Sequence, residues 1–291
     1  MVNVQKAWLE EQVRQRDEQG IKPTACNTPH RVSDVQSCVR KLTLTAHKAR
    51  ESEEFTSNTF MNFLIGNAIH ESIQESLDQV GWHFEAEVPI DLTEASKKVG
   101  HGVEEFGLSG HADGIITHED NTRTVVEIKS VGGFAAKKSW PYPGNAEGPK
   151  REHWAQGALY AVGAEADAVM IVYVAKESDY RAGIKAGDIM QWDRGLHEVH
   201  PDGGQSLYDI AMDELRHFQY ADRYYRKGMI APAFVPNDYG ELELIHDRPE
   251  YMAKKGNWRC RYCMFNTVCR SLPADEEVPV EMVDRVQHAD A

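Results

Sequence analysis

One stretch of the chain places charged side chains inside two strands that are otherwise apolar. Runs rich in apolar and β-branched residues, 106–117 and 123–130, flank a polar turn, which predicts a β-hairpin. Asp113 interrupts the first run, whereas Glu127 and Lys129 interrupt the second. Because alternate residues of a strand share a face, Glu127 and Lys129 point the same way. Such charges are costly on an apolar strand unless they pair or bind something.

The chemistry of these three residues suits a metal-dependent hydrolase. Asp113 and Glu127 offer the hard oxygen ligands that Mg²⁺ or Mn²⁺ prefers. A metal held there would polarise a phosphodiester and lower the pKa of the attacking water. Lys129 would orient that water or neutralise charge developing on phosphorus. The alternative is a structural Glu–Lys pair beside an unrelated turn aspartate.

Composition limits the class of protein. The 291 residues, 41% hydrophobic and 27% charged, are typical of a soluble globular chain with one large domain or two small ones. The first twenty residues are polar, and no apolar run approaches the length of a membrane span, so we expect a cytoplasmic protein without membrane contact. The net charge of −14 disfavours nucleic acid as a partner, but residues 274–291 alone hold six acids and one arginine.

Hydrophobic periodicity predicts an α/β (α+β) fold, with a central mixed sheet from about residue 82 to 176 flanked by helices. We expect an N-terminal helical region (1–59), a core (60–200) and a C-terminal region (201–291), together forming one compact unit. Helices are predicted at 1–20, 33–44, 60–80, 153–164 and 205–228, strands at 82–92 and 168–175, loops at 93–105 and 132–150, and an exposed hairpin around Trp192–Gly195 within 180–200.

Two of the predicted helices carry further candidate residues. His70 lies four residues after Gly66, beside the apolar stripe of helix 60–80, although a core or surface histidine is the simpler interpretation. Gln156 and Tyr160 are four apart and share a face of helix 153–164. The stripe of helix 60–80 comprises Phe60, Phe63, Leu64, Ala68, Ile69, Ile73 and Leu77. The basic and aromatic loop 132–150 suits single-stranded nucleic acid, or it is a plain surface loop.

The five cysteines form a pattern of their own. They are Cys26, Cys38, Cys260, Cys263 and Cys269. An odd count with clustering favours metal ligation over disulfides. Four thiolates suit zinc or an iron–sulfur cluster, but a zinc ribbon usually brings two C-x₂-C pairs and only one is present, which favours iron–sulfur. Such a cluster would join the N-terminal region to the C-terminal segment.

Taken in order, the candidate residues form a recognisable set: His70, Asp113, Glu127-Ile128-Lys129 and Gln156-x-x-x-Tyr160. This order resembles the RecB-type branch of the PD-(D/E)XK nuclease superfamily. The resemblance implies that His70, Asp113, Glu127 and the backbone carbonyl of Ile128 bind the metal. It further implies that Lys129, with Asp113 and Glu127, is catalytic, and that Gln156 and Tyr160 bind substrate.

The cysteines narrow the resemblance. Cys38, followed more than two hundred residues later by Cys260-x₂-Cys263-x₅-Cys269, resembles the four-cysteine CRISPR-associated (Cas-four type) exonuclease family, over about residues 33–270. That family implies a [4Fe–4S] cluster on these four cysteines. Cys26 is an extra cysteine and an alternative fourth ligand, but Cys38 is preferred because residues 33–42 match the corresponding segment of the family. The family also implies a Mg²⁺- or Mn²⁺-dependent exonuclease acting on single-stranded DNA ends, prokaryotic or phage-encoded, in repair or recombination.

Two other functions remain open from the sequence. One is a non-catalytic iron–sulfur subunit that binds DNA within a recombination or repair complex. The other is a redox or iron–sulfur regulatory protein. A CRISPR role is not implied, because related nucleases also act outside CRISPR systems. Neither partner proteins nor an oligomeric state follow from the sequence.

Overall fold

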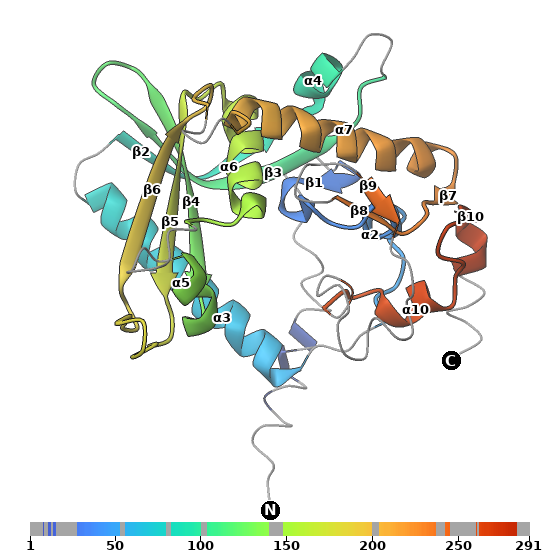
Figure 1. Cartoon of the computed structure of the whole chain (residues 1–291), viewed down its shortest axis with the longest axis horizontal. Helices are drawn as coiled ribbons and strands as arrows, with labels where there is room; N and C mark the ends of the chain where they lie inside the picture. Colours follow the sequence, from blue (N-terminus) through green and yellow to red (C-terminus); the bar gives the residue numbers. More distant parts are fainter. Residues whose placement is uncertain are drawn as a thin grey trace, which may run out of the picture. The chain divides into compact units, whose positions relative to one another are not determined.

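The computed structural model describes residues 8, 11–12, 14–15, 28–52, 56–79, 83–99, 104–139, 148–199, 204–236, 242–244, 260 and 262–283. The chain divides into two compact units, each built from separate stretches of sequence (Figure 1). Unit 1 comprises Met1–Cys26, Phe55–Ile90 and Gly110–Ala211, and unit 2 comprises Asn27–Glu54, Asp91–Ser109 and Met212–Ala291. No helix of the described part is both long and apolar enough to cross a membrane.

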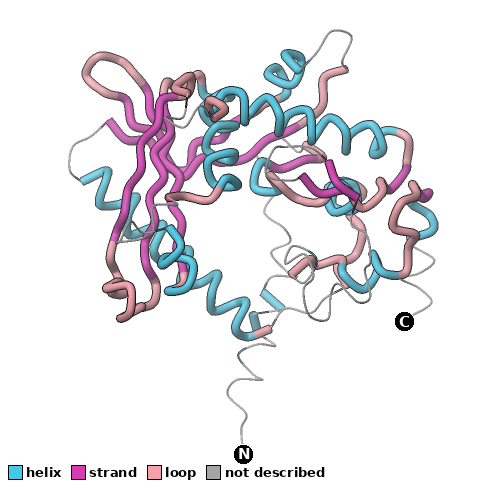
Figure 2. The backbone as a smooth tube through the Cα atoms, viewed as in Figure 1, coloured by secondary structure: helices cyan, strands magenta, loops and turns pink. Residues whose placement is uncertain are grey.

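A mixed sheet is the centre of unit 1, and Figure 2 draws its strands in magenta. Besides the short β1 (His30–Arg31), which is described with unit 2, its strands are β2 (His83–Asp91), β3 (Leu108–Thr117), β4 (Arg123–Val131), β5 (Ala168–Ala175) and β6 (Ile189–Gly195). β3 pairs with β2 and runs antiparallel to β4, β4 runs parallel to β5, and β5 runs antiparallel to β6. The predicted α/β class and mixed sheet are confirmed, but the sheet extends beyond residue 176 to include β6.

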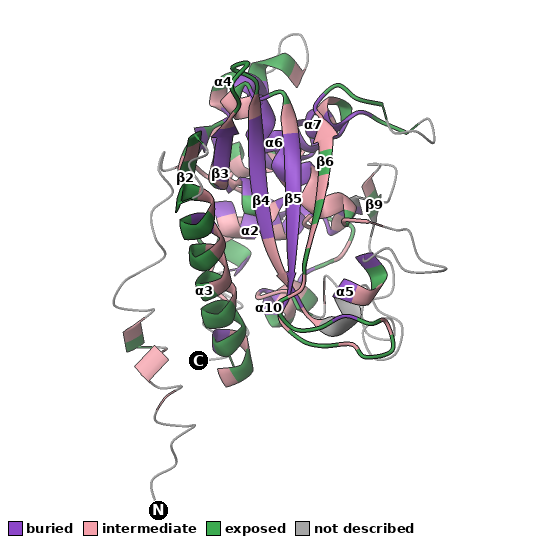
Figure 3. Cartoon of the chain, turned by 90° about the vertical axis from the view of Figure 1, so that its left-hand side faces the viewer, coloured by how far each residue is buried: buried purple, intermediate pink, exposed green. Residues whose placement is uncertain are grey.

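Helices cover both faces of this sheet, which explains why β5 is an unbroken apolar run (Figure 3). On one face, α3 (Ser57–Gln79) packs Ile69, Ile73 and Leu77 against buried side chains of β3, β4 and β5. On the other face lies α6 (Arg151–Ala164), the crossover between parallel strands β4 and β5. A Cβ at Gly157 of α6 would lie 2.5 Å from Val169, so the helix approaches β5 closely.

The apolar stripe predicted for α3 is only partly buried. Phe60 and the C-terminal residues of the stripe pack inward, but Phe63 and Leu64 are 53% and 46% exposed. The exposed surface of α3 is seen as green ribbon in Figure 3. Periodicity identified the helix correctly, but it could not show that only part of the stripe packs against the apolar cluster of the sheet.

Unit 2 is assembled from short elements around a second apolar core. They are β1 (His30–Arg31), η1 (Val32–Asp34), α2 (Val39–Ala46), α4 (Thr93–Ser96), η2 (Lys97–Val99), the later part of α7 (Leu207–Arg226), β7 (Met229–Ile230), β8 (Phe234–Pro236), β9 (Leu242–Leu244), α10 (Asn266–Arg270) and β10 (Val278–Pro279). β7 pairs with β10, and β8 pairs with β9. β1 pairs in parallel with the first residues of β3, through His30 and Leu108. The core includes Leu44, Phe265 and Val268.

Several local predictions were wrong. The helix expected from residue 33 begins at Val39, because η1 and a turn precede it. The stretch 93–105, predicted as a connection, contains α4 and η2, and the predicted loop 132–150 contains α5 (Gly133–Ser139). Trp192–Gly195 lies within β6, and the turn of the hairpin comes earlier, at the Asp179–Ile184 bridge. Most of helix 1–20, as well as Cys26 and residues 284–291, lies outside the described residues.

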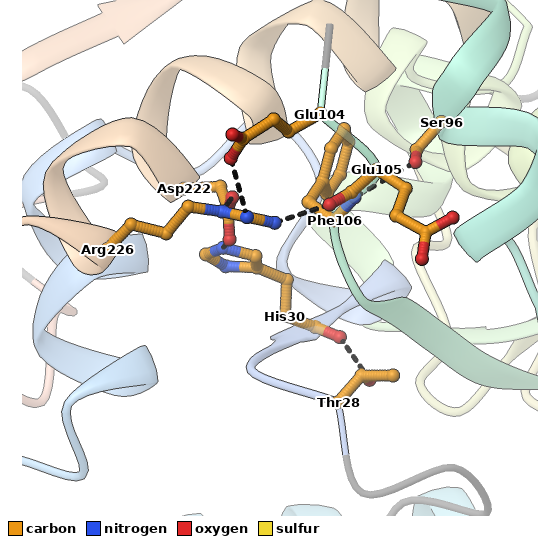
Figure 4. A network of polar contacts seen from close by, with 8 residues as sticks. All are labelled: Thr28, His30, Ser96, Glu104, Glu105, Phe106, Asp222 and Arg226. Carbon is orange, nitrogen blue, oxygen red and sulfur yellow. Dashed lines mark hydrogen bonds and ion pairs between the residues drawn. The ribbon is translucent and has the colours of Figure 1, made fainter.

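A polar network centred on Arg226 holds three segments of unit 2 together (Figure 4). Arg226, near the end of α7, donates to Asp222, to the Glu105 carbonyl and, at 2.9 Å, to Glu104. The buried Asp222 also lies 3.4 Å from His30 Nε2 of β1. Burial would raise the pKa of Asp222, but His30 and Arg226 outweigh it and lower that pKa. The network therefore fixes β1 and the segment before β3 on α7.

A second arginine, Arg40 of α2, is fully buried and donates to several backbone carbonyls. Its Nε lies 2.7 Å from the Ala231 carbonyl, and its Nη2 lies 2.6 Å from that of Pro273 and 3.0 Å from that of Glu276. A planar guanidinium has five N–H donors in a fixed fork, whereas an ammonium has three on a single nitrogen. Arg40 thus joins α2 to two distant stretches of the same unit.

Replacing Arg40 with methionine should lower the free energy of unfolding by about 3 kcal/mol, because the buried Ala231 carbonyl and the part-buried carbonyls of Pro273 and Glu276 would lose their donor. Chemical denaturation would measure this change. Arg40→Lys should recover only part of the loss, and Arg223→Met, at an exposed position of α7, is the matched control. An Arg40→Met variant as stable as the Arg223→Met control would contradict the prediction.

Candidate functional site

The site is built where β3 and β4 part. Their register runs from Thr117–Arg123 to Gly114–Val126, and Asp113 lies one residue beyond the last pair. There a side chain replaces the backbone acceptor of the ladder, since Asp113 Oδ2 accepts a hydrogen bond from the Ile128 N–H at 2.6 Å. A charge-assisted bond to backbone of this kind is strong, and it fixes the direction of the carboxylate.

Two glycines allow neighbours to press closely on β3. A Cβ at Gly114 would overlap the Phe84 ring of β2, and one at Gly110 would lie 2.8 Å from the Tyr160 hydroxyl of α6. Both glycines flank Asp113 at short range in sequence, so larger side chains there would displace the strand that carries it.

His70 of α3 approaches the same carboxylate. Its Nδ1 lies 3.4 Å from Asp113 Oδ1. Burial opposes the charged form, but the hydrogen bond and charge of Asp113 outweigh it, and they raise the pKa of His70. The structure therefore brings together two residues that are 43 positions apart in the sequence, one on a helix and one on a strand.

Glu127 and Lys129 form a buried ion pair on β4. Glu127 is 0% exposed, and its Oε1 lies 2.5 Å from Lys129 Nζ. Burial raises the pKa of Glu127 to about 7, although Lys129 acts against it. Burial opposes the charge of Lys129, yet the Glu127 and Asp113 carboxylates raise its pKa. No described residue donates a hydrogen bond to Glu127 Oε2, so this carboxylate fits a hard cation.

Gln156 and Tyr160 of α6 lie behind Lys129. Lys129 Nζ donates to Gln156 Oε1 at 3.1 Å, so Gln156 helps to aim the ammonium. Tyr160 is 2% exposed and hydrogen-bonds to Gln156 and to the backbone at His111. Burial raises the pKa of Tyr160, which keeps its hydroxyl neutral. Contact of either residue with substrate stays a prediction.

The sequence analysis missed a polar pair beside Lys129. Tyr173 of β5 stands opposite Lys129 in the parallel register, and its hydroxyl lies 2.5 Å from His153 Nδ1 of α6. Burial, with Lys129 and Lys150 nearby, lowers the pKa of His153 well below its usual value, so the imidazole stays neutral. The available signal was His153 itself, three residues before Gln156 and on the same helical face.

The predicted metal ligands lie as two neighbouring pairs rather than around one point. His70 is paired with Asp113, and Glu127 with Lys129. Within the described residues, no group of three or more His, Cys, Asp or Glu side chains is arranged to hold a metal ion. Ile128 lies between Glu127 and Lys129, with its N–H held by Asp113.

Four cysteines lie in unit 2, and none of them forms a disulfide. Cys38 is the N-cap of α2 and packs, like Cys260, against the small cluster of Ala233 and Val235. Burial raises the pKa of Cys38 to about 12, and the nearby Cys269 and Cys260 thiols act in the same direction. Lys41, one turn after Cys38, interacts electrostatically with both Cys263 and Cys38.

Comparison with known proteins identifies the family. Residues 9–270 match the profile of the PD-(D/E)XK nuclease superfamily. The chain belongs to this superfamily. A solved structure described as "Crystal structure of SSO0001" is similar to the present chain, with a TM-score of 0.50 and 15% sequence identity. The match covers 91% of this chain and 95% of that one. A search of curated proteins found no match. Membership in the superfamily suggests a metal-dependent nuclease acting on DNA, of the kind that uses Mg²⁺ or Mn²⁺.

The raised pKa of Glu127 predicts pH-dependent metal binding. Below its pKa of about 7 the carboxyl holds a proton that a metal must displace, and His70, whose pKa is also raised, acts in the same direction. Mn²⁺ affinity without DNA should therefore fall by at least about tenfold for each pH unit below 7, because Glu127 alone accounts for one displaced proton. Calorimetric titration from pH 6 to 8 would measure this fall. A flat affinity would contradict it, and Glu85→Gln, at an exposed acid of β2, should leave the pH dependence unchanged.

Proposed function

We propose that this superfamily member is a divalent-metal-dependent DNA exonuclease of the RecB-like branch, acting on single-stranded ends. The observation that carries the proposal is the buried Glu127–Lys129 pair beside Asp113, at the point where β3 and β4 part. A structural ion pair alone would not require a neighbouring carboxylate and a helical histidine, and both are present here. The same geometry favours catalysis over a purely DNA-binding or redox role.

Each residue has a role in the proposed reaction. His70, Asp113, Glu127 and the Ile128 carbonyl would hold Mg²⁺ or Mn²⁺, which supplies Lewis acidity toward the scissile phosphate and lowers the pKa of water when bound. Lys129 is kept charged by Glu127 and aimed by Gln156. It offsets the negative charge that develops on the phosphate and orients the attacking water.

The exposed surface of α3 supports single-stranded DNA as the substrate. Phe63, Gly66 and His70 recur at helical spacing, so Phe63 lies on the face of α3 that carries His70. Phe63 is 53% exposed, and exposed aromatic rings stack on unpaired bases whatever their sequence. A Cβ at Gly66 would lie 3.5 Å from Ser130 Oγ, near the end of β4, so this part of α3 adjoins the strand of the site.

The cysteines support a [4Fe–4S] cluster as part of the same proposal, in the manner of the Cas-four type family. Cys38, Cys260, Cys263 and Cys269 belong to one unit, and the Cys38 thiol is near those of Cys269 and Cys260. A buried thiol with a raised pKa is poorly suited to reactive chemistry, whereas a thiolate is stabilised by a bound metal. These residues fit a cluster or a zinc ion, and analysis of bound metal distinguishes the two.

Asp113→Ala, Glu127→Ala and Lys129→Ala should each reduce cleavage by several orders of magnitude, because these groups act on one transition state. The assay uses end-labelled single-stranded, duplex and circular DNA with Mn²⁺. The parent protein should shorten linear single strands and leave circles intact. A Lys129→Ala variant with near-parental activity would refute the assignment. A parent that binds DNA but cleaves none of the three would instead favour the accessory-subunit alternative.

Anaerobically purified protein should be brown and contain about four irons per chain. Cys38→Ser should lose iron and melt at a lower temperature, because the cluster would tie α2 to the C-terminal cysteines. Cys26→Ser is the matched control and should keep both properties. Loss of iron in Cys26→Ser but not in Cys38→Ser would move the fourth ligand to Cys26. Zinc without iron in the parent would replace the cluster by a zinc site.

A further inference from the structure

A single buried amide joins three elements next to the candidate metal site. Gln74 of α3 is 8% exposed and lies one helical turn after His70. Its Nε2 lies 2.7 Å from the Asp113 carbonyl of β3 and 3.0 Å from Glu87 Oε1 of β2. An amide nitrogen has two hydrogens, so these two bonds use its full donor capacity.

Glu87 adopts an unusual backbone conformation to take part. It lies within β2 at φ 51°, in the left-handed region that residues other than glycine seldom occupy. Strain of this kind persists only where the surrounding structure imposes it, and it often accompanies functional sites. The Glu87 carboxylate accepts the bond from Gln74, which also donates to the Asp113 carbonyl of the candidate site.

The bonds to Asp113 together fix its position. The Oδ2 atom of Asp113 is held by the Ile128 N–H, Oδ1 by His70, and the backbone carbonyl by Gln74. Because Asp113 lies beyond the last β3–β4 pair, the ladder between these strands does not set its position. Residues 70 and 74 project from one face of α3, so the helix holds both the carboxylate and the carbonyl of residue 113.

We propose that Gln74 is a positioning residue for the metal site, with Glu87 holding the Gln74 amide in place. This inference rests on the proposed function, in that a metal binds at Asp113. In metal sites generally, loss of a residue that orients a ligand weakens metal affinity by about 10- to 100-fold. Gln74 acts through Asp113 and His70, and needs no contact with substrate or metal.

The alternative is that Gln74 only stabilises the fold. Two substitutions separate the two roles. Gln74→Met keeps the length of the side chain and removes both hydrogen bonds. Glu87→Gly removes the support of the Gln74 amide and also relieves the left-handed strain at residue 87. A purely structural role predicts that metal affinity stays constant in both, whatever happens to the melting temperature.

The experiment measures Mn²⁺ binding by calorimetry without DNA, and the melting temperature without metal. The dissociation constant compared is that of the Mn²⁺ site that disappears in the Asp113→Ala variant. Gln74→Met should raise its dissociation constant by about 10- to 100-fold. Glu87→Gly should weaken binding less, without lowering the melting temperature. Gln79→Met, at an exposed glutamine of the same helix, is the matched control and should change neither.

Unchanged Mn²⁺ affinity in Gln74→Met would overturn the inference while leaving the nuclease proposal intact. If Gln74→Met fails to fold, Glu87→Gly decides alone, and its unchanged affinity has the same meaning. A parent protein that binds Mn²⁺ at Asp113 but cleaves no DNA would refute the proposed function without touching the inference. A parent with no Mn²⁺ site that depends on Asp113 would overturn both.

Discussion

The site depends on one hydrogen bond, from the Ile128 backbone to the Asp113 carboxylate. This bond lies just past the end of the β3–β4 ladder, so the strands separate there without leaving the Ile128 N–H unpaired. Where the strands separate, His70 and Gln74 of α3 contact Asp113 in place of a ladder partner. The same carboxylate raises the pKa of His70 and, together with Glu127, that of Lys129. Asp113 therefore determines both the arrangement of the site and the charge of its neighbours.

The sequence predicted the strongest elements of the fold well. β5 and α6 were recognisable because an unbroken apolar run and a helical period leave few alternatives. The short helices α4 and α5 were not, because they lack an amphipathic period and are set by packing. β1, with two residues, carries no readable pattern, and it forms only because His30 and Arg31 find the start of β3.

The residues of the candidate site likewise fall into those that the sequence predicted and those that it did not. Asp113, Glu127 and Lys129 were predictable because charge is conspicuous on an apolar strand. Gln74 and Tyr173 were not, because an amide in a helix of mixed polarity or a tyrosine in an apolar strand is unremarkable until its partners are known. Positioning residues are defined by tertiary contacts, so a single sequence identifies charged groups more readily than the groups that orient them.

The discontinuity of unit 2 has a consequence for biosynthesis. Arg40 bonds to carbonyls 191 to 236 residues later in the chain, so α2 stays without these acceptors until the C-terminal region has left the ribosome. The longest segment of unit 1, Gly110–Ala211, is complete well before that. During synthesis Cys38 therefore emerges before the C-terminal cysteines, and contacts of such long sequence separation form slowly. Any metal or cluster that needs Cys38 and Cys269 together is acquired only after the segment that carries Cys269 has left the ribosome.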